Sequence, residues 1–586
     1  MEWICQKGRC TLLRGMRRMK KICAGSIHIW SDCLRMADMS SLDKDKKSEK
    51  VLSCQKTCDK IERNGQKKET KLYICDGSDI GQEKQRGSMG VLYRSTRGNE
   101  ESVSASKAIL EGLASDGGLF VPQALPSFDK TLDEFAQMDY RQTAYEVMKL
   151  LLTDFTEEEL RYCIDKAYDG KFDTEAIAPL AEVKNAWYLE LFHGPTIAFK
   201  DMALSILPYL MTTAAKKNQI KNEIVILTAT SGDTGKAALA GFADVPGTRI
   251  MVFYPKDGVS PIQEKQMVTQ TGANTRVIGI HGNFDDAQSG VKKLFADKEL
   301  AAWMEERGYQ FSSANSINIG RLVPQIVYYV YAYAQLVKEG RIKAGEEINV
   351  TVPTGNFGNI LAAYYAKNMG LPIKKLICAS NDNKVLYDFF RTGAYDRNRD
   401  FILTTSPSMD ILISSNLERL IYRIAGENAA CNASLMAALA GDGKYEITAE
   451  MKEKLGDFYG NYATQEECAA QIRSLYEDTD YVLDPHTAVA AAVYNKYKEE
   501  TGDTTKTVIA STASPYKFPR SICRALGLDV SNKNDFEVLK LLNEYTNIEI
   551  PNNLKGLDVK KVIHNKVCNK EKMKESLLEF LKENKN

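Results

Sequence analysis

From about residue 89 onward, short β-rich runs alternate with segments of helical period, and this alternation constrains the fold more than any other feature of the chain. The pattern is typical of βαβ units, in which a helix connects each parallel strand to the next. We therefore predict an α/β protein with a mostly parallel sheet. Because 586 residues exceed the usual size of one compact domain, we expect more than one such domain.

The clearest runs are rich in β-branched and aromatic residues and have the length of buried strands. The expected strands are 187–192, 224–227, 249–254, 275–280, 348–352 and 507–510. Helices are expected over 201–209, 236–242 and 261–271, and from the loop after residue 352 up to Asn368. Ligands of open parallel sheets bind where strands end and helices begin, so we expect the binding site at these loops.

One of these loops is suited to bind a phosphate group. It consists of Gly355, Asn356, Phe357, Gly358 and Asn359, and it lies between an expected strand and an Ala-rich helix. Small residues leave the backbone N–H groups accessible, and the positive end of the helix dipole favours an anion there. The alternative is an ordinary turn with a helix cap, because glycine and asparagine favour both structures.

A second loop follows the expected strand 224–227. It consists of Thr230, Ser231, Gly232, Asp233, Thr234 and Gly235, whose hydroxyl and amide groups suit a carboxylate or a second phosphate. The nearest alternative is a nucleotide-binding P-loop, because Gly235 and Lys236 resemble its last residues. That motif requires glycine at Thr230 and serine or threonine at Ala237, so the alternative fails at two positions.

Lys200 is the candidate catalytic residue. It follows Ala198 and Phe199 and directly precedes the expected helix 201–209. Burial beside apolar residues and the positive end of a helix dipole both disfavour the ammonium form, which leaves a neutral amine for imine formation. The alternative is a solvated surface lysine, because most lysines are exposed.

The two loops and the lysine together closely resemble the longer subgroup of the threonine synthases. The matching segments are His193 to Asp201 (HGPTIAFKD), Thr230 to Gly235 (TSGDTG) and Pro353 to Asn359 (PTGNFGN). Further matches are Gly117 to Pro122, Asn315 to Asn318, Asp484 to Thr487 and Ser511 to Pro519, so the resemblance spans residues 89 to about 575. It implies a tryptophan-synthase-β-like fold (PLP fold type II), in which two open, mostly parallel, doubly wound α/β domains hold pyridoxal 5'-phosphate in the cleft.

The resemblance also implies roles for individual residues around the cofactor. Lys200 matches the Schiff-base lysine, and Gly355 to Asn359 match the loop that receives the cofactor phosphate. Thr512 matches the hydroxyl that faces the pyridine nitrogen. Asp233 stands where sibling enzymes have an asparagine next to the cofactor ring oxygen, and Ser514 stands where many members of the family have histidine.

Two segments are expected to bind the substrate. Thr230, Ser231, Gly232, Thr234 and Gly235 belong to the loop that the resemblance assigns to the substrate carboxylate. The candidates for the substrate phosphate are Asn315, Ser316, Asn318 and Arg321, and Arg321 offers two parallel N–H donors. The alternative for these four residues is ordinary helix capping and a surface arginine.

The family converts O-phosphohomoserine and water into threonine and phosphate, which implies a lyase of threonine biosynthesis with a small-molecule substrate. A threonine-synthase-like phospholyase would share the cofactor motifs but would release 2-oxobutyrate and ammonia, so it remains an alternative. A cofactor-free binding protein with the same fold is a third reading, and the intact lysine and phosphate loop argue against it. We expect a monomer or homodimer without a metal ion, nucleic acid or membrane contact.

Residues 1–88 differ in composition from the rest of the chain. They hold 20 Lys and Arg against 12 Asp and Glu, and seven of the 13 cysteines. We expect a basic, solvated leader that is either disordered or an extension from a misplaced start codon; organelle targeting has weak support because serines are scarce. Cys54 and Cys58 have a spacing allowed for zinc, but no second ligand pair follows. The other six cysteines are scattered singly, which favours a reduced, cytoplasmic protein.

These observations divide the chain into five segments. The expected segments are the leader 1–88, a small amino-terminal domain 89–180, the cofactor-binding α/β core 181–389, a helical insertion 390–480, and the end of the core with carboxyl-terminal helices 481–586. The insertion is expected because residues 390–480 interrupt the alternation with polar helical segments and few strand signals.

Overall fold

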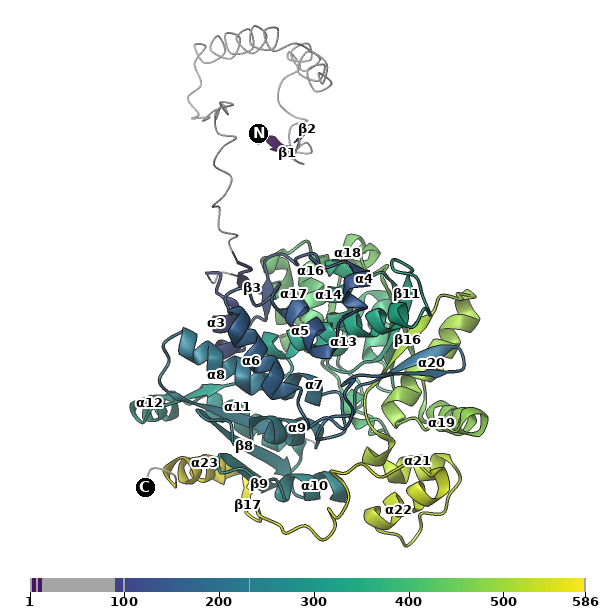
Figure 1. Ribbon diagram of the computed structural model, residues 1–586. Coiled ribbons are helices and arrows are strands. Elements are labelled where there is room, and N and C mark those ends of the chain that lie inside the picture. Colours follow the sequence, from purple (N-terminus) through teal and green to yellow (C-terminus); the bar gives the residue numbers. More distant parts are fainter. Residues whose placement is uncertain (1–2, 7–8, 13–89, 99–100, 231, 584–586) are drawn as a thin grey trace, which may run out of the picture. The chain divides into compact units, whose positions relative to one another are not determined.

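The computed structural model describes residues 3–6, 9–12, 90–98, 101–230 and 232–583. The chain divides into two units, Met1–Ser88 and Met89–Asn586. In the first unit, strands β1 (Trp3–Gln6) and β2 (Arg9–Leu12) form an antiparallel pair. The predictions for Cys54, Cys58 and most of the leader fall outside the described residues. The second unit contains both large sheets (Figure 1).

The first large sheet has five strands, and every neighbouring pair is parallel. In spatial order its strands are β10 (Tyr309–Ser312), β7 (Glu223–Ala229), β8 (Thr248–Pro255), β9 (Thr275–His281) and β17 (Val567–Asn569). Strand β17 comes from the carboxyl-terminal part of the chain and pairs with β9, so a segment far along the sequence completes this sheet.

The second large sheet has six strands. In spatial order they are β15 (Phe458–Tyr462), β12 (Ile373–Ser380), β11 (Ile348–Pro353), β16 (Thr507–Ser511), β6 (Ala186–Glu190) and β5 (Leu180–Val183). The edge pair β5 and β6 is antiparallel, and the other neighbouring strands are parallel. The predicted α/β class with mostly parallel sheets is therefore confirmed.

The central strands are buried on both faces, which explains why they form continuous apolar runs in the sequence. All residues of β8 and β11 are buried. Each of the six expected strands is present, and none of their ends differs by more than two residues from the prediction. The prediction worked at these places because burial on both faces leaves a strong sequence signal.

Helices connect the strands and pack against both sheets (Figure 1). Those nearest the loops of interest are α7 (Asp201–Leu204), α8 (Leu207–Lys217), α9 (Asp233–Phe242), α10 (Pro261–Val268), α13 (Ile319–Lys338), α14 (Gly358–Met369) and α20 (Pro485–Thr501). Helix α13 is almost wholly buried and packs against α14 on one side and α5 (Tyr140–Met148) on another. Within the described part of the chain, no helix combines the length and apolar character needed to cross a bilayer.

The remaining elements lie around this framework. They are β3 (Tyr93–Ser95), α3 (Ala105–Glu111), β4 (Phe120–Pro122), α4 (Leu132–Phe135), α6 (Glu157–Ala167), α11 (Phe284–Ala296), α12 (Lys298–Glu306), α15 (Val385–Thr392), β13 (Ala394–Asp396), η2 (Pro407–Met409), α16 (Leu417–Ile424), α17 (Ala429–Gly441), β14 (Lys444–Glu446), α18 (Ala449–Glu453), α19 (Gln465–Thr479), η3 (Pro515–Lys517), α21 (Pro519–Ala525), α22 (Asp535–Thr546), η4 (Lys570–Lys572) and α23 (Met573–Lys582).

Two expectations need correction. Residues 390–480 are not a purely helical insertion, because they contain β15, which pairs with β12 at the edge of the six-stranded sheet. Its glycine and asparagine weaken the apolar pattern by which we recognise strands. The expected helix 201–209 is divided into α7 and α8 near Ser205, and Pro208 lies in the first turn of α8, where its missing N–H group costs nothing.

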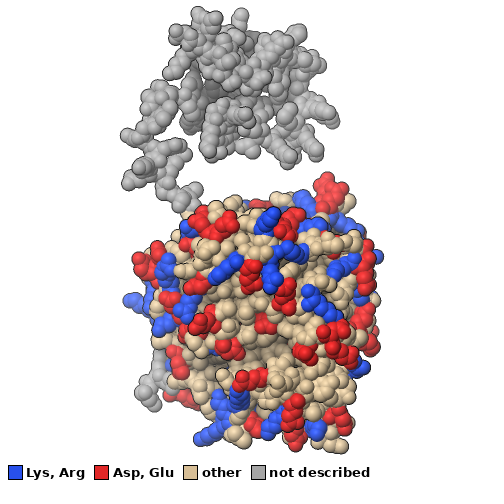
Figure 2. Space-filling model, turned by 45° about the vertical axis from the view of Figure 1, so that its right-hand side comes forward, with Lys and Arg blue, Asp and Glu red and all other residues tan. Residues whose placement is uncertain are grey.

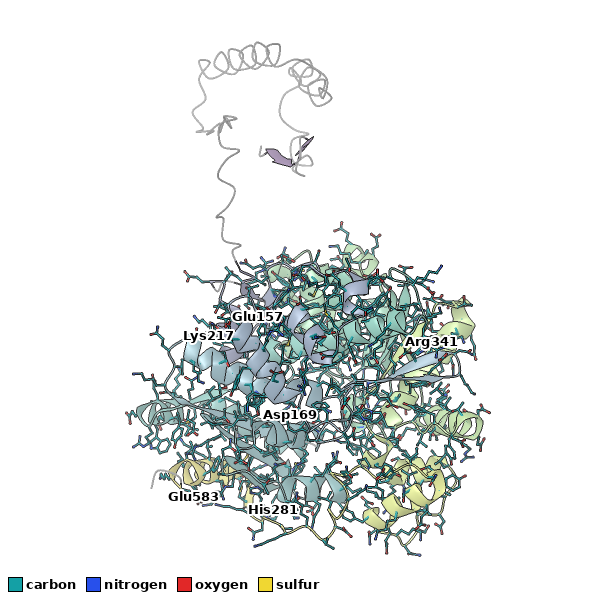
Figure 3. The ribbon with its side chains drawn as sticks, in the orientation of Figure 1. Glu157, Asp169, Lys217, His281, Arg341 and Glu583 are labelled. Atoms are coloured by element: carbon teal, nitrogen blue, oxygen red, sulfur yellow. The ribbon has the colours of Figure 1, made fainter. Side chains whose placement is uncertain are left out.

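The surface of the second unit carries both signs of charge. On the face shown in Figure 2, acidic and basic side chains are interspersed. Some ion pairs connect distant parts of the chain; Arg341, labelled in Figure 3, lies 2.7 Å from Glu182 of β5. Such exposed pairs contribute little stability, about 0 to 1 kcal/mol each, so the buried core holds the elements in place.

Candidate active site

Lys200 lies where two neighbouring strands of the six-stranded sheet end. Strand β6 leads into the loop 193–199, and β16, its parallel neighbour, leads into the loop that contains Thr512. The two loops are bonded to each other, because Phe199 N donates to Thr512 O at 2.8 Å and Ala198 forms an antiparallel bridge with Ala513. Lys200 is thus fixed at the carboxyl ends of the strands, directly before α7, as predicted.

The loop in front of Lys200 is held by a buried carboxylate. Asp201 accepts hydrogen bonds from Thr196 N at 2.7 Å and from Thr196 Oγ1 at 2.5 Å. A side chain at Gly194 would lie 2.5 Å from Asp201 Cβ, so glycine is needed for this close approach. Burial raises the pKa of Asp201, although its bonds to Thr196 and the charge of Lys517 oppose that rise.

The Lys200 amine faces a carboxylate and a hydroxyl. Its Nζ lies 3.4 Å from Asp233 Oδ2 and 3.1 Å from Ser408 Oγ, and its side chain is 11% exposed. Burial lowers the pKa of Lys200, and the positive charges of Lys517 and Arg321 lower it further, against the opposing effect of Asp233. This environment favours the neutral, nucleophilic amine that the sequence predicted.

Asp233 is the first residue of α9 and the centre of the polar cluster. Its Oδ1 accepts a hydrogen bond from Gln263 Nε2 at 2.8 Å and lies 3.1 Å from Lys517 Nζ, and its Oδ2 accepts from Ser408 Oγ at 3.1 Å. Burial alone would raise the pKa of this carboxyl, but Lys517 and Lys200 outweigh burial and hold the pKa well below its usual range. Asp233 is therefore an anion that joins the two sheets at this point.

The loop before Asp233 is stabilised from within. Thr230 Oγ1 accepts hydrogen bonds from Gly232 N at 3.0 Å and from Gly235 N at 2.9 Å. These two amides are therefore engaged inside the loop, and Thr234 is left half-buried as a candidate contact. Gly232 has a φ of 135°, and a side chain there would lie 2.5 Å from Gln263. Ser231 falls outside the described residues.

The loop Gly355 to Asn359 joins β11 to α14. Phe357 has a φ of 65° at the amino-terminal cap of α14, and a side chain at Gly355 would lie 2.6 Å from Ser408 O. Asn359 Oδ1 accepts hydrogen bonds from Tyr328 at 2.8 Å and from Tyr329, whereas its Nδ2 is buried and has no partner among the described residues. An unsatisfied amide donor beside a helix amino terminus suits a phosphate oxygen.

Thr512 and Ser514 follow β16. Thr512 N donates to Thr487 Oγ1 at 3.2 Å, and the residue is 5% exposed, so its position is fixed. Ser514 Oγ accepts from Tyr516 N at 3.3 Å and caps η3. This contact gives Ser514 a local structural role.

The four candidates for the substrate phosphate divide into two groups. Asn318 caps α13 by accepting from Gly320 N at 2.8 Å, and its Nδ2 donates to Ile109 O and Ser313 O, both at 2.9 Å. The alternative of ordinary helix capping therefore describes Asn318 better than a substrate contact. Asn315 is exposed, and its Oδ1 accepts from Ile317 N and Ser316 Oγ, both at 3.3 Å. Asn315 and Ser316 thus form a local turn at the surface.

Arg321 is a different case, and the alternative of a surface arginine is wrong. It is 3% exposed, Nη1 donates to Ala314 O at 3.0 Å, and Nε is buried without a partner among the described residues. Burial lowers the pKa of Arg321 to about 10, which leaves the guanidinium charged at neutral pH. A buried cation with an unused donor, close enough to influence Lys200, suits an anionic ligand.

Sequence reasoning missed Lys517, Gln263, Ser408 and His486 as members of the site. His486 Nε2 accepts from Ser408 N at 3.1 Å, and its Nδ1 lies 2.9 Å from Asp484 Oδ1, so this pair positions the segment that carries Ser408. Residues 400–416 show no periodic pattern, so nothing in the sequence directed attention to Ser408. Lys517 is flanked by aromatic and proline residues, and this apolar context is the sequence signal that could have indicated its burial.

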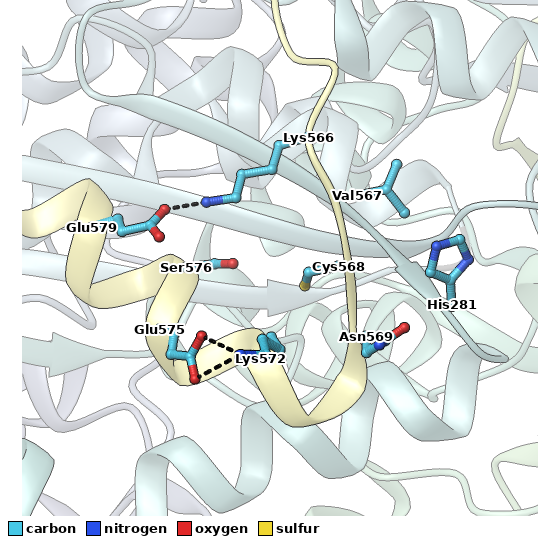
Figure 4. Close-up of a pocket in the computed structure, with 9 residues that line it drawn as sticks. All are labelled: His281, Lys566, Val567, Cys568, Asn569, Lys572, Glu575, Ser576 and Glu579. Atoms are coloured by element: carbon cyan, nitrogen blue, oxygen red, sulfur yellow. Dashed lines mark hydrogen bonds and ion pairs between the residues drawn. The ribbon is translucent and has the colours of Figure 1, made fainter.

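A surface hollow of about 380 Å³ lies elsewhere, between β17 and α23 (Figure 4). Its lysines are already paired, Lys572 with Glu575 at 3.0 Å and Lys566 with Glu579. None of the residues predicted to bind cofactor or substrate lines it. The hollow is therefore separate from the residues around Lys200.

Comparison with known proteins identifies the family of this chain. Three family models match the chain: "Threonine synthase N terminus" over residues 92–168, "Pyridoxal-phosphate dependent enzyme" over residues 173–513 and "Threonine synthase, C-terminal" over residues 487–573. The second model alone matches more than half of the chain.

Relatives and a solved structure lead to the same family. Threonine synthase-like 1 of Homo sapiens is 41% identical over 465 residues, which are 76% of this chain and 61% of that protein, so the chain spans less than two thirds of this relative. Threonine synthase of Schizosaccharomyces pombe is 37% identical over 468 residues, 74% of this chain and 89% of that protein. The crystal structure of PLP-bound threonine synthase from Brucella melitensis is 35% identical, covers 84% of this chain and 100% of that chain, and has a TM-score of 0.75. This chain belongs to the threonine synthase family of pyridoxal-phosphate-dependent enzymes.

Proposed function

We propose that this chain is a threonine synthase, which converts O-phosphohomoserine and water into threonine and inorganic phosphate. The observation that carries the proposal is the position of the Lys200 amine, buried beside Asp233 at the carboxyl ends of the strands. It is supported by the 37% identity with the threonine synthase of Schizosaccharomyces pombe over most of that protein.

The residues present fit pyridoxal phosphate. Lys200 supplies the amine for covalent attachment, and the loop Gly355 to Asn359 offers the positive end of α14 and the unpartnered Nδ2 of Asn359 to the cofactor phosphate. Thr512 is the candidate partner of the ring nitrogen. When bound, the cofactor supplies an electron sink that stabilises negative charge on the substrate carbons.

Lys200 is the proposed general base. Its lowered pKa lets the neutral amine accept the Cα proton of the bound substrate at Nζ. Ser408 Oγ and Asp233 Oδ2 then lie within reach of the ammonium group that results, at 3.1 and 3.4 Å in this structure. These two residues hold the proton on Lys200 until it is returned.

Arg321 is the proposed contact of the substrate phosphate. Its unused Nε and its charge suit a dianionic group, and its buried position excludes water from that group. Loss of a Cβ proton lets phosphate leave Cγ with the electrons of the C–O bond; water later adds at Cβ, and protons return to Cγ and Cα. Arg321 stabilises the phosphate that leaves, while Thr234 and its neighbours in the 230–235 loop are the proposed contacts of the substrate carboxylate.

A phospholyase is the second candidate function. It would convert O-phosphohomoserine and water into 2-oxobutyrate, ammonia and phosphate. The 41% identity with threonine synthase-like 1, above the 37% with a threonine synthase, is the observation in its favour. The described contacts of Lys200 and Asp233 serve either outcome, because both begin with proton removal at Cα and release of phosphate.

One incubation with O-phosphohomoserine tests the proposal. The purified protein should release phosphate and threonine in equal amounts, without 2-oxobutyrate. Equal amounts of phosphate, 2-oxobutyrate and ammonia would establish the phospholyase instead. Release of neither amino-acid nor keto-acid product from a protein with bound cofactor would refute both assignments.

A cytoplasmic location remains a prediction. The six cysteines between residues 90 and 583 are free thiols, which is consistent with a reducing compartment.

A further inference from the structure

Lys517 is a buried cation to which the proposed reaction gives no role. It ends the short helix η3, and its side chain is 1% exposed. Its Nζ donates to Thr196 O at 2.9 Å and lies 3.1 Å from Asp233 Oδ1. Burial of an ammonium group is costly unless the group is paired with an anion. The ion pair with Asp233 therefore stabilises the buried ammonium group of Lys517.

The Asp233 carboxylate therefore lies between two lysines, and its two oxygens are used differently. Oδ1 receives Lys517 and Gln263 Nε2, at 3.1 and 2.8 Å. Oδ2 receives Ser408 Oγ at 3.1 Å and lies 3.4 Å from Lys200 Nζ, which is the longer of the two lysine contacts. One carboxylate balances one ammonium charge, and the closer partner is Lys517.

This division matters for Lys200, because a lysine paired alone with a buried carboxylate would stay protonated. An ammonium group cannot form an imine or accept a proton. Lys517 removes that obstacle by neutralising Asp233 itself, and its positive charge also disfavours a second cation nearby. The carboxylate can then remain beside Lys200 as a hydrogen-bond acceptor without trapping it as an ion pair.

We propose that Lys517 is a positioning residue of the active site, which binds Asp233 as its counter-ion and thereby disfavours protonation of the Lys200 nitrogen. The proposal rests on the role of Lys200 as the residue that carries the cofactor. It does not depend on which product the enzyme releases.

Three further charged groups act on Lys200, Asp233 or Lys517, namely Arg321, His486 and Asp201. Arg321 approaches from α13 and acts in the same direction as Lys517, because burial, Lys517 and Arg321 all lower the pKa of Lys200. His486 of α20 acts on Asp233 and is bonded to Ser408 and Asp484. Asp201 acts on Lys517 and is bonded to Thr196. Besides Lys200, Lys517 is the cation that forms an ion pair with Asp233 among the described residues.

Lys517→Met tests the proposal in the enzyme with bound cofactor. The visible absorbance of the cofactor changes with protonation of the Lys200 nitrogen to which it is linked, so a pH titration reports that nitrogen directly. Loss of the neighbouring positive charge should raise the midpoint by about 1 unit or more, because Asp233 would then pair with the Lys200 nitrogen alone. Lys517→Arg retains the charge and should titrate like the unaltered enzyme.

Two further variants keep the test decisive if Lys517→Met does not fold. Asp233→Asn leaves Lys517 without its counter-ion and should shift the midpoint downward, the opposite direction. Lys236→Met is the matched control: Lys236 belongs to α9, the helix that begins at Asp233, but it is bonded to Gln270, so its loss should leave the midpoint unchanged. A folded Lys517→Met enzyme with an unchanged or lowered midpoint, or an unchanged midpoint in Asp233→Asn, would overturn the proposal.

The titration separates this inference from the proposed function. A merely structural Lys517 would lower the melting temperature without moving the midpoint. If the unaltered enzyme forms no threonine but Lys517→Met raises the midpoint, the role of Lys517 stands and the assigned reaction falls. If threonine is formed and the midpoint does not move, the reaction stands and the role of Lys517 falls.

Discussion

Asn416 donates two hydrogen bonds to the backbone carbonyl of Asn356, from its own backbone N at 3.1 Å and from its Nδ2 at 3.0 Å. Asn416 Oδ1 in turn accepts from the guanidinium of Arg419, which is fully buried and also donates to Phe120 O at 3.0 Å. Arg419 Nη2 donates to Ile317 O at 2.5 Å. The proposed phosphate loop is therefore bonded, through two side chains, to the segment before α13.

Asn416→Ala should weaken cofactor binding. It removes one hydrogen bond to the loop and leaves a buried arginine donor without its partner, a cost of about 1 to 3 kcal/mol. Because the loop is proposed to bind the cofactor phosphate, we expect the dissociation constant of pyridoxal phosphate to rise about 5- to 150-fold. Equilibrium titration of the cofactor measures it. Ser415→Ala is the control, since Ser415 makes a single exposed contact with Asn356 Oδ1 at 3.2 Å; an equal effect in both variants would contradict the prediction.

Arg321→Ala should impair use of the phosphorylated substrate and leave the cofactor content unchanged. Loss of a charge-assisted contact with the substrate phosphate costs about 1.5 to 3 kcal/mol, so kcat/KM should fall about 10- to 150-fold. Steady-state kinetics measure the fall in kcat/KM, and the cofactor absorbance measures the cofactor content. Arg341→Ala, which removes an exposed arginine paired with Glu182, should change neither. Loss of cofactor from the Arg321 variant with retained substrate affinity would reverse the assignment.

Most of the central strands and the two glycine loops could be predicted from the sequence, because their signals are local; the central strand β12 was missed. Strand β11 is buried throughout, and Gly355 permits the close approach of Ser408 O that a side chain would block. The roles of Lys200 and Thr512 were predicted from the resemblance to a family, because a single lysine or threonine has no sequence signal of its own that indicates such a role. Edge strands β15 and β17 were missed because each is short or polar and gains its stability from pairing with a neighbour.

The polar cluster could not be predicted, because it is assembled across the fold. Asp233 meets Ser408 and Lys517 over separations of 175 and 284 residues, and no local pattern encodes such a meeting. The same limit explains Asn318. As part of a polar run it suggested a substrate contact, whereas its amide group is fully engaged with Ile109, Ser313 and Gly320 once α3 and α13 pack together.

Deletion of residues 1–88 should leave turnover and cofactor content unchanged. The family models begin at residue 92, and the second unit has its own buried core, which includes Tyr93 and Phe120. The truncated protein should therefore fold with the same melting temperature. Kinetics, absorbance and thermal unfolding of both forms provide the measurement. A soluble truncated protein that binds the cofactor but turns over slowly would show that the leader shapes the site.

His193 should make stability depend on pH near neutrality. Its Nδ1 lies 2.6 Å from Asp173 Oδ1 and its Nε2 lies 3.0 Å from Glu190 Oε2. Burial alone would lower the pKa of His193, but the two carboxylates outweigh burial and raise it. The stabilisation that protonated His193 gives the folded protein is therefore fully present below its pKa in the unfolded chain, which is about 6.5. It is lost as the pH rises through the higher pKa of His193 in the folded protein. Melting temperatures of the unaltered protein should fall over this range more than those of His193→Gln; parallel curves would contradict the assignment.

Lys200→Ala should abolish turnover, because the variant has neither the amine that carries the cofactor nor the base that removes the Cα proton. Cofactor binding should be weakened but not lost, since the loop Gly355 to Asn359 and the unpartnered Nδ2 of Asn359 remain to hold the phosphate. Borohydride should then fix no cofactor to the chain. In the unaltered protein, reduction followed by peptide mapping should place the label on Lys200 alone. Lys236 is the internal control, because burial lowers its pKa to about 7 and so favours a neutral amine there as well. A label on Lys236, or threonine formation at the normal rate by Lys200→Ala, would transfer the catalytic role to a different lysine.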